Sequence, residues 1–185
     1  MPAYKFFKRK YGEDEFDLRE RKNEIVGLIN EGKGNWIITF CLAVMPQENK
    51  LKFAEYIANE MNRDFAGDIP FQAGKYLKLL IAGDDTTQEL KNLLKSVNAE
   101  IATLPTETPL EKGKCELYKG VRHLVRCVDE DMQQRLSVSV RHLVEAYVCK
   151  EWADDEFAQV INIRNEKYRH YALYAMTLTE IWPLD

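Results

Sequence analysis

The chain has 185 residues, of which 45% are hydrophobic and 30% are charged. A chain of this length can bury one sizeable core, and its composition excludes a disordered, collagen-like or low-complexity protein. Its 26 basic and 30 acidic residues give a formal net charge of −4, which argues against a general nucleic-acid coat protein.

Apolar residues recur at helical spacing nearly throughout, and no convincing stretch alternates as a β-strand would. The spacing predicts helices before residue 104 at about 14–31, 36–45, 46–65, 71–82 and from Asp84 or Asp85 to about 101. We expect Gly32 and Gly34 to end the first helix, Asn35 to cap the second and Pro46 to open the third. The segment 36–45 is very apolar but far shorter than the roughly 20 residues that span a bilayer, which favours a buried helix.

The best internal boundary is the segment 103–113, which contains Pro105, Pro109 and Gly113. It would connect possible lobes 1–104 and 110–185 within a single helical domain spanning 1–185. Beyond it the spacing predicts two helices of about 17 residues and a longer last helix that runs to about residue 181. Asp131 begins a capping-box pattern at the start of the second of these helices, and Asp154 or Asp155 is expected to cap the last. The whole pattern predicts an all-α protein of about eight antiparallel helices, in a single bundle or a short irregular stack.

The N-terminal residues lack the apolar stretch of a secretory leader, which indicates a cytoplasmic protein. Cysteines 41, 115, 127 and 149 lie within helical patterns, so we expect free thiols rather than disulfides. The chain also lacks the glycine-rich phosphate loops, the metalloprotease motif and the EF-hand loop, and we expect no cofactor.

One pentapeptide, Val-Arg-His-Leu-Val, occurs at 121–125 and again at 140–144. Each copy lies on a helix with one apolar stripe, and four side chains are expected to face away from that stripe: His123, Cys127, His142 and Cys149. Two sulfurs and two nitrogens would suit zinc. If the two stripes share one core, however, the His/Cys faces point away from each other, and we predict no metal site.

Arg164 and His170 lie six positions apart in a charged stretch of the last predicted helix. This spacing resembles the arginine–histidine signature of the HEPN family of small all-helical RNases. The resemblance implies metal-independent cleavage, in which His170 handles the proton of the attacking ribose hydroxyl and Arg164 steadies the phosphate. On one straight helix the two side chains lie 120° apart, so their convergence needs a bend or a second subunit, and the family usually builds its site across a dimer.

Acidic side chains gather at three predicted helix junctions. The clusters are Asp84 and Asp85; Asp129, Glu130 and Asp131; and Asp154, Asp155 and Glu156. Carboxylates at such junctions cap helices and suit the positive end of the helix dipole, and along one rim they would also attract a basic partner. Trp152 lies beside the last cluster, where an aromatic side chain could anchor an interface.

A small acidic all-helical chain of this kind is similar to the immunity proteins of bacterial toxin systems. The pattern of Trp36, Phe40, the Pro46 break and Phe53 on the next helix is similar to some bacterial helical families of unknown or immunity function. The resemblance implies a cytoplasmic immunity protein that occludes a basic toxin nuclease, without cofactor or direct membrane contact. The alternative is the HEPN-type RNase, and nucleic-acid binding is expected only under this alternative. A third hypothesis is a helical scaffold whose Arg-His pairs between 122 and 142 hold an anionic ligand.

Overall fold

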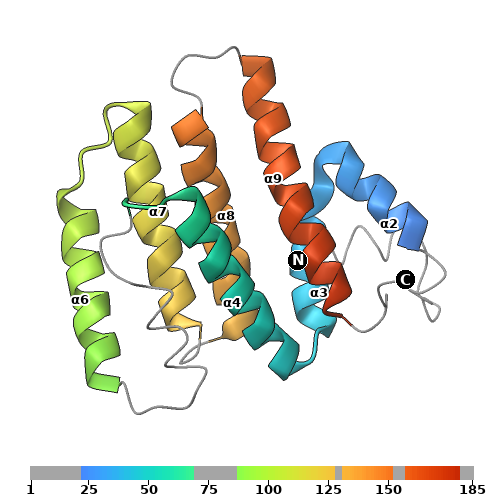
Figure 1. The fold of residues 1–185 in the computed structure, drawn as a ribbon, viewed down its shortest axis with the longest axis horizontal. Coiled ribbons are helices and arrows are strands. Elements are labelled where there is room, and N and C mark those ends of the chain that lie inside the picture. The colour runs from blue at the N-terminus through green and yellow to red at the C-terminus, as the bar shows by residue number, and fades with distance from the viewer. Residues whose placement is uncertain (1–21, 69–86, 128–130, 152–156, 180–185) are drawn as a thin grey trace.

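A computed structural model of the chain describes residues 22–68, 87–127, 131–151 and 157–179 (Figure 1). The regular structure in these ranges is helical, with no strand, which confirms the predicted all-α class. The elements are α2 (Lys22–Leu28), the π-helical turn η1 (Ile29–Lys33), α3 (Gly34–Val44), α4 (Gln47–Asp64), α6 (Thr87–Thr103), α7 (Pro109–Arg126), α8 (Met132–Glu151) and α9 (Phe157–Thr177). The helix predicted at 71–82 lies outside the described residues.

The six longer helices, α3, α4 and α6 to α9, pack together. The most extensive contact joins α7 to α8, and α6 lies on the outer side of α7 (Figure 1). On the other side, α9 lies against α3 and α8, while α2 and η1 form the far edge beside α9 (Figure 1). Helix α4 crosses one face of this row (Figure 1). No described helix combines the length and the apolar composition needed to cross a membrane.

One connected cluster of buried hydrophobic side chains holds the helices together. It includes Ile37 of α3, Phe53 and Ile57 of α4, Val121 of α7 and Tyr171 of α9, each at most 1% exposed. These residues come from both sides of the proline-containing connection, so the core is shared by the two possible lobes. The apolar stripes predicted for these helices are therefore buried. The division of the chain into two lobes stays a prediction.

Two of the predicted helix starts agree with the structure. Pro46 directly precedes α4, and Asp131 Oδ1 accepts a hydrogen bond from the Gln134 N–H at 3.2 Å, as an N-terminal cap does. Gly32 has a left-handed backbone (φ 82°) that interrupts the helix, which confirms the predicted end of the first helix there. The expected cap at Asn35 is wrong, because α3 begins at Gly34 and its N-cap position is Lys33. At Gly34 a Cβ atom would lie 3.0 Å from the backbone of Tyr168, so glycine at this position allows α3 and α9 to approach closely.

The connection between α6 and α7 is shorter than the sequence predicts. Only residues 104–108 are non-helical, and Pro109 occupies the first position of α7, where proline needs no N–H partner. Thr108 and Glu111 form a capping box: the Glu111 N–H donates to Thr108 Oγ1 at 3.3 Å, and the Thr108 N–H donates to Glu111 Oε2 at 2.9 Å. The prolines therefore mark a helix start rather than a long boundary.

The outward orientation predicted for the histidines and cysteines of α7 and α8 is wrong. Cys127 and Cys149 are buried, and the rings of His123 and His142 stack with centroids 5.5 Å apart. The reason is that α7 packs against both α6 and α8, so two of its sides are covered instead of one. All four cysteines are buried free thiols, and no three metal-binding side chains of the described residues lie together.

Candidate functional site

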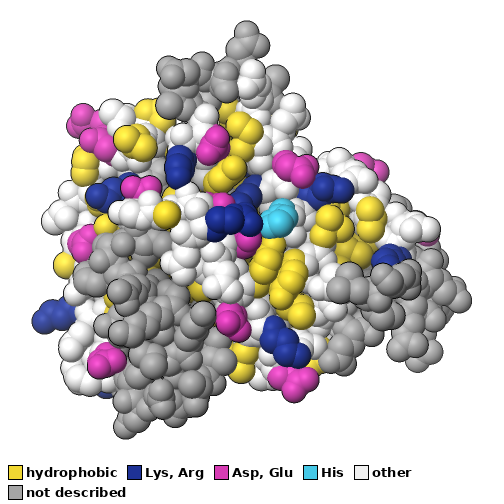
Figure 2. Space-filling model, in the orientation of Figure 1, with side chains coloured by type: hydrophobic (Ala, Val, Ile, Leu, Met, Phe, Trp, Pro, Cys, Tyr) yellow, Lys and Arg dark blue, Asp and Glu magenta, His cyan; other side chains and the backbone are white. Residues whose placement is uncertain are grey.

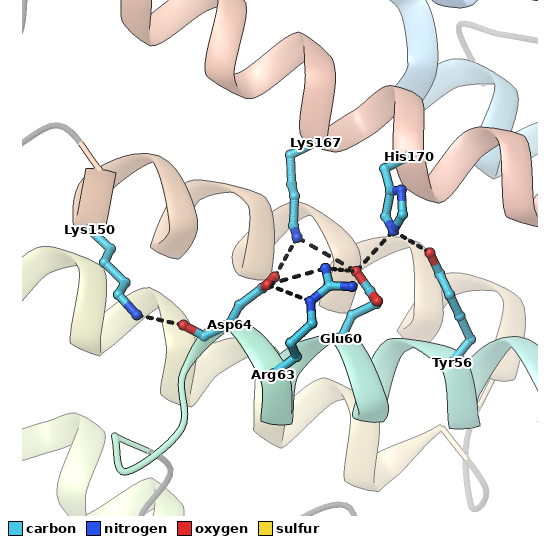
Figure 3. Close-up of polar contacts among 7 residues, drawn as sticks. All are labelled: Tyr56, Glu60, Arg63, Asp64, Lys150, Lys167 and His170. Atoms are coloured by element: carbon cyan, nitrogen blue, oxygen red, sulfur yellow. Dashed lines mark hydrogen bonds and ion pairs between the residues drawn. The ribbon is translucent and has the colours of Figure 1, made fainter.

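Charged side chains are buried where α9 packs over the C-terminal half of α4 (Figure 3). Glu60 is 6% exposed and Lys167 is 8% exposed, although such residues are rarely buried unless they are paired. We call this group the α4–α9 charge cluster. Its members are Tyr56, Glu60, Arg63 and Asp64 of α4, Lys150 of α8, and Lys167 and His170 of α9.

Helical spacing brings these residues onto facing surfaces. Tyr56, Glu60 and Asp64 follow one another at intervals of four on α4, so their side chains lie on one face. Lys167 and His170 are three residues apart on α9 and likewise share a face. The two carboxylates of α4 therefore face the two basic side chains of α9 (Figure 3).

Each of the two carboxylates is bound by more than one basic side chain. Glu60 Oε2 lies 2.5 Å from Arg63 Nη2, 3.0 Å from His170 Nε2 and 3.7 Å from Lys167 Nζ. Asp64 binds Lys167 Nζ through Oδ2 and lies 3.3 Å from Arg63 Nε through Oδ1. A buried charge is stable only when it is paired and hydrogen-bonded in this way.

The ammonium group of Lys167 is also surrounded by aromatic rings. Its Nζ lies 4.5 Å from the centroid of Tyr147 and 5.7 Å from that of Tyr171. The faces of aromatic rings attract cations, most strongly where water is excluded. Lys150 contributes from α8, where its Nζ donates to the backbone carbonyl of Asp64 at 2.5 Å. The C-terminus of α4 is thus bound to both α8 and α9.

Tyr56 and His170 form the more exposed end of the cluster. Tyr56 Oη lies 2.5 Å from His170 Nε2, and the Tyr56 ring stacks on Tyr174 with centroids 3.7 Å apart. Burial, and then the charge of Glu60, raise the pKa of Tyr56 above its usual value, so the phenol keeps its proton. It can therefore donate to a neutral His170, whereas a protonated His170 donates to Glu60.

An open hollow of about 470 Å³ lies beside the cluster, lined in part by Arg63, Tyr147, Lys167 and His170. The side chains of His170 and Arg63 are 47% and 59% exposed, so both can reach a molecule in this hollow. On the face drawn in Figure 2, the basic and acidic side chains of the described residues are intermingled and form no extended patch of one charge. The hollow could take a small polar group, although its basic side chains are already bound to carboxylates.

The structure does not bring Arg164 and His170 together within one chain. Arg164 forms a two-pronged ion pair with Glu145 of α8, with its Nε and Nη2 each 2.8 Å from a carboxylate oxygen. The hydrogen bond with Glu145 raises the pKa of Arg164. His170 instead contacts Glu60 of α4, so the two residues that resemble the RNase signature are bound to different helices.

Of the predicted acidic clusters, the structure describes one residue. Asp131 is exposed and caps α8. The remaining residues predicted to contact a partner lie outside the described residues: Asp84, Asp85, Asp129, Glu130, Trp152, Asp154, Asp155 and Glu156.

Sequence reasoning missed most of the α4–α9 charge cluster. Its signal is a pair of acidic residues four apart, Glu60 and Asp64, on a helix whose apolar positions include Ile57 and Met61. A second signal is Lys167, which precedes a run of aromatic residues on the last helix. A charge placed among core positions indicates a buried ion pair, but it does not identify the partner.

Comparison with known proteins gives no match to this chain among protein-family models, curated proteins or solved structures.

Proposed function

We propose that the chain is a non-catalytic protein-binding domain, most concretely a cytoplasmic immunity protein that neutralises a basic toxin nuclease by occluding it. One observation carries the preference for binding over catalysis. Arg164 and His170, the pair that an RNase would need, are bound to Glu145 and Glu60 on two different helices. In that arrangement they stabilise helix packing instead of forming one reactive site.

The acidic clusters are the reason for choosing a basic partner. They hold eight carboxylates at three helix junctions, in a chain whose formal net charge is −4. Clustered charge steers an oppositely charged partner during approach and raises the association rate. In this proposal Trp152 provides an apolar anchor beside the third cluster, because aromatic side chains often dominate binding energy at interfaces.

The test compares charge reversal inside and outside the clusters. One variant carries Asp154→Lys, Asp155→Lys and Glu156→Lys, and the matched control carries Glu48→Lys, Glu89→Lys and Glu107→Lys, which are exposed positions outside the clusters. Both variants change the net charge by the same amount. Each is used to capture basic proteins from the native host at about 50 mM and about 500 mM salt, since salt screens exposed charges.

We expect wild type and control to retain a stoichiometric basic protein at low salt and to lose it at high salt. The cluster variant should bind it at least tenfold more weakly, with little dependence on salt. Equal binding by the cluster variant and the control would exclude the acidic clusters as the contact surface.

The HEPN-type RNase is the second candidate function. The observation that favours it is the exposure of His170, whose side chain lies at the hollow together with Arg63 and Lys167. Because Arg164 lies elsewhere in the same chain, the site would have to be completed by a second copy. This candidate predicts a dimer and RNA cleavage in the presence of a chelator that His170→Ala and Arg164→Ala each abolish. A stable monomer, or cleavage that survives His170→Ala, would exclude it.

A further inference from the structure

Another hollow, of about 290 Å³, lies where the end of α4 meets the first turns of α7 and the end of α8. It is lined in part by Phe65, Leu110, Lys114, Leu117, Ala146 and Lys150, and we call it the Phe65 hollow. Its volume equals that of about ten water molecules in the liquid, which leaves room for a molecule of about ten non-hydrogen atoms. This size lies at the lower end of the range for small-molecule sites.

The floor of the Phe65 hollow is apolar and firmly held. Phe65, Leu117 and Ala146 are each at most 4% exposed and belong to the hydrophobic core. At the edge, Leu110 is 71% exposed and extends the apolar lining toward the solvent. A single exposed leucine is ordinary, but beside a preformed apolar hollow it adds to the surface that a bound hydrocarbon removes from water. The floor therefore favours an apolar ligand body.

The ammonium group of Lys150 lies beside this floor. Its Nζ is 5.5 Å from the centroid of the Phe65 ring and donates to the Asp64 carbonyl at 2.5 Å. An ammonium group has three donors, and a carbonyl carries no net charge. Among the described residues no carboxylate lies within ion-pair distance of Nζ, so Lys150 keeps a positive charge and further donors for a ligand in the hollow.

Lys114 provides a second ammonium group on the same rim. It follows Leu110 by four residues and precedes Leu117 by three, so the three side chains share one face of α7. Lys114 is exposed, its Nζ lies 5.9 Å from the centroid of Tyr118, and within the described ranges it forms no ion pair. The basic side chains of the larger hollow are, by contrast, already bound to the carboxylates of α4.

Two acidic side chains also line the Phe65 hollow, but they form no ion pair with these lysines. Glu111 accepts a hydrogen bond from the Thr108 N–H at 2.9 Å, which holds its carboxylate at the start of α7. Asp68 is exposed and forms no ion pair in the described part of the chain. Its charge opposes an anion in the hollow, but it is a single exposed charge that faces two ammonium groups. The rim therefore favours an anionic head group.

We propose that the Phe65 hollow binds a small amphiphilic carboxylic acid, with its hydrocarbon tail on Phe65, Leu117 and Ala146 and its carboxylate between Lys114 and Lys150. A linear acid of about eight carbons has the number of non-hydrogen atoms that the volume accommodates. An alcohol with the same tail would not use the two charges, and an amine would be repelled by them. The inference does not depend on the proposed immunity function.

The experiment titrates the full chain with sodium octanoate at neutral pH. Calorimetry gives the affinity, and NMR of the Leu110, Leu117 and Ala146 methyl groups shows where the ligand binds. Octanol and octylamine, which carry the same tail, are the controls for the head group.

A double variant, Lys114→Gln with Lys150→Gln, tests the rim. Its matched control is Lys95→Gln with Lys112→Gln, two exposed lysines that do not line the Phe65 hollow, so both variants change the net charge equally. Thermal unfolding shows that each variant is folded. Lys114→Gln alone keeps the contact between Lys150 and Asp64, and it replaces the double variant if loss of that contact unfolds the chain.

We expect octanoate to saturate the protein below about 1 mM, and octanol and octylamine to bind at least about fivefold more weakly. The double variant should weaken octanoate binding by about fivefold or more and leave octanol binding unchanged, whereas the control should bind octanoate like the wild type. Asp68→Asn should strengthen octanoate binding. Dodecanoate should bind little more tightly than octanoate, because its added carbons lie outside the hollow.

Four results would overturn the proposal. They are the absence of saturable binding, octanol binding as tight as that of octanoate, equal weakening by the two double variants, and methyl shifts that leave Leu117 and Ala146 unaffected. A protein C-terminus with apolar residues carries the same carboxylate, so acetyl-leucyl-leucine is titrated as well. Binding of this peptide that is tighter than that of octanoate would replace the small acid by a protein partner and would also contradict the proposal.

Discussion

Lys167 and Asp64 form an ion pair that joins the middle of α9 to the C-terminal end of α4. Their side chains are only 9% and 8% exposed, so water cannot replace either partner. Removing one member of a buried pair leaves an uncompensated charge and costs about 3–5 kcal/mol. We expect Lys167→Met to lower the free energy of unfolding in urea by about that amount.

Arg169 provides the control for this change. It lies two residues away on α9, is 43% exposed and pairs with Glu166 on the surface. Arg169→Met should cost less than about 1 kcal/mol, because exposed ion pairs contribute little. Adding Glu60→Gln and Asp64→Asn to Lys167→Met should restore part of the lost stability, and no recovery would contradict the assignment of the loss to buried charge.

Gly120 allows α7 and α8 to approach closely. A Cβ atom at this position would lie 2.8 Å from Cγ and Cδ2 of the buried Leu143. We expect Gly120→Ala to destabilise the protein by about 1 kcal/mol, because overpacking outweighs the better helix propensity of alanine. Gly27→Ala on α2, where nothing lies within 4 Å of the new Cβ, should instead stabilise it. Equal effects of the two substitutions in thermal unfolding would show that the contact with Leu143 does not matter.

Thr108 caps the first turn of α7 through its hydroxyl oxygen. Loss of such a cap typically costs about 1 kcal/mol, and we expect Thr108→Ala to lower the free energy of unfolding accordingly. Thr106→Ala, two residues earlier in the non-helical connection, is the matched control and should have almost no effect. Urea unfolding of the two variants side by side measures the difference.

His123 should make the folded state sensitive to mild acid. Its pKa is about 4 in the folded chain against an ordinary value of 6.5, so between these values the unfolded chain binds a proton that the folded chain does not. The free energy of unfolding therefore falls as the pH is lowered through this window, by on the order of 1–2 kcal/mol after allowance for the partly exposed ring.

Stability curves of the wild type and His123→Gln between these pH values measure the effect. Titrating groups that do not interact with His123 contribute equally to both proteins and cancel in the difference. The variant should lose less stability in acid than the wild type, and parallel curves would show that folding does not lower the pKa of His123.

Local sequence patterns predicted where the helices lie, but not which residues of other helices their side chains contact. The apolar stretch at 36–45 and the proline at 46 gave α3 and the start of α4 almost to the residue, since both depend on neighbours in the sequence. Asp131 was correctly assigned as a cap for the same reason. These features need no knowledge of the remaining chain.

The site could not be predicted in this way. Glu60 and Lys167 are separated by more than a hundred residues, and only the packing of α9 against α4 makes them partners. The same holds for His123 and His142: a single apolar stripe predicts one buried side of a helix, whereas α7 is covered on two sides. Side-chain orientation follows from tertiary packing that one helix does not reveal.

The packing of α3 against α9 has a consequence for synthesis of the chain on the ribosome. Ile37, Ile38 and Cys41 of α3 are fully or almost fully buried, and α9, which packs against that helix, begins more than a hundred residues later in the chain. Until α9 emerges, this apolar helix lacks one of its coverings and is exposed to aggregation or chaperone binding. This part of the native core therefore cannot form until α9 has left the exit tunnel.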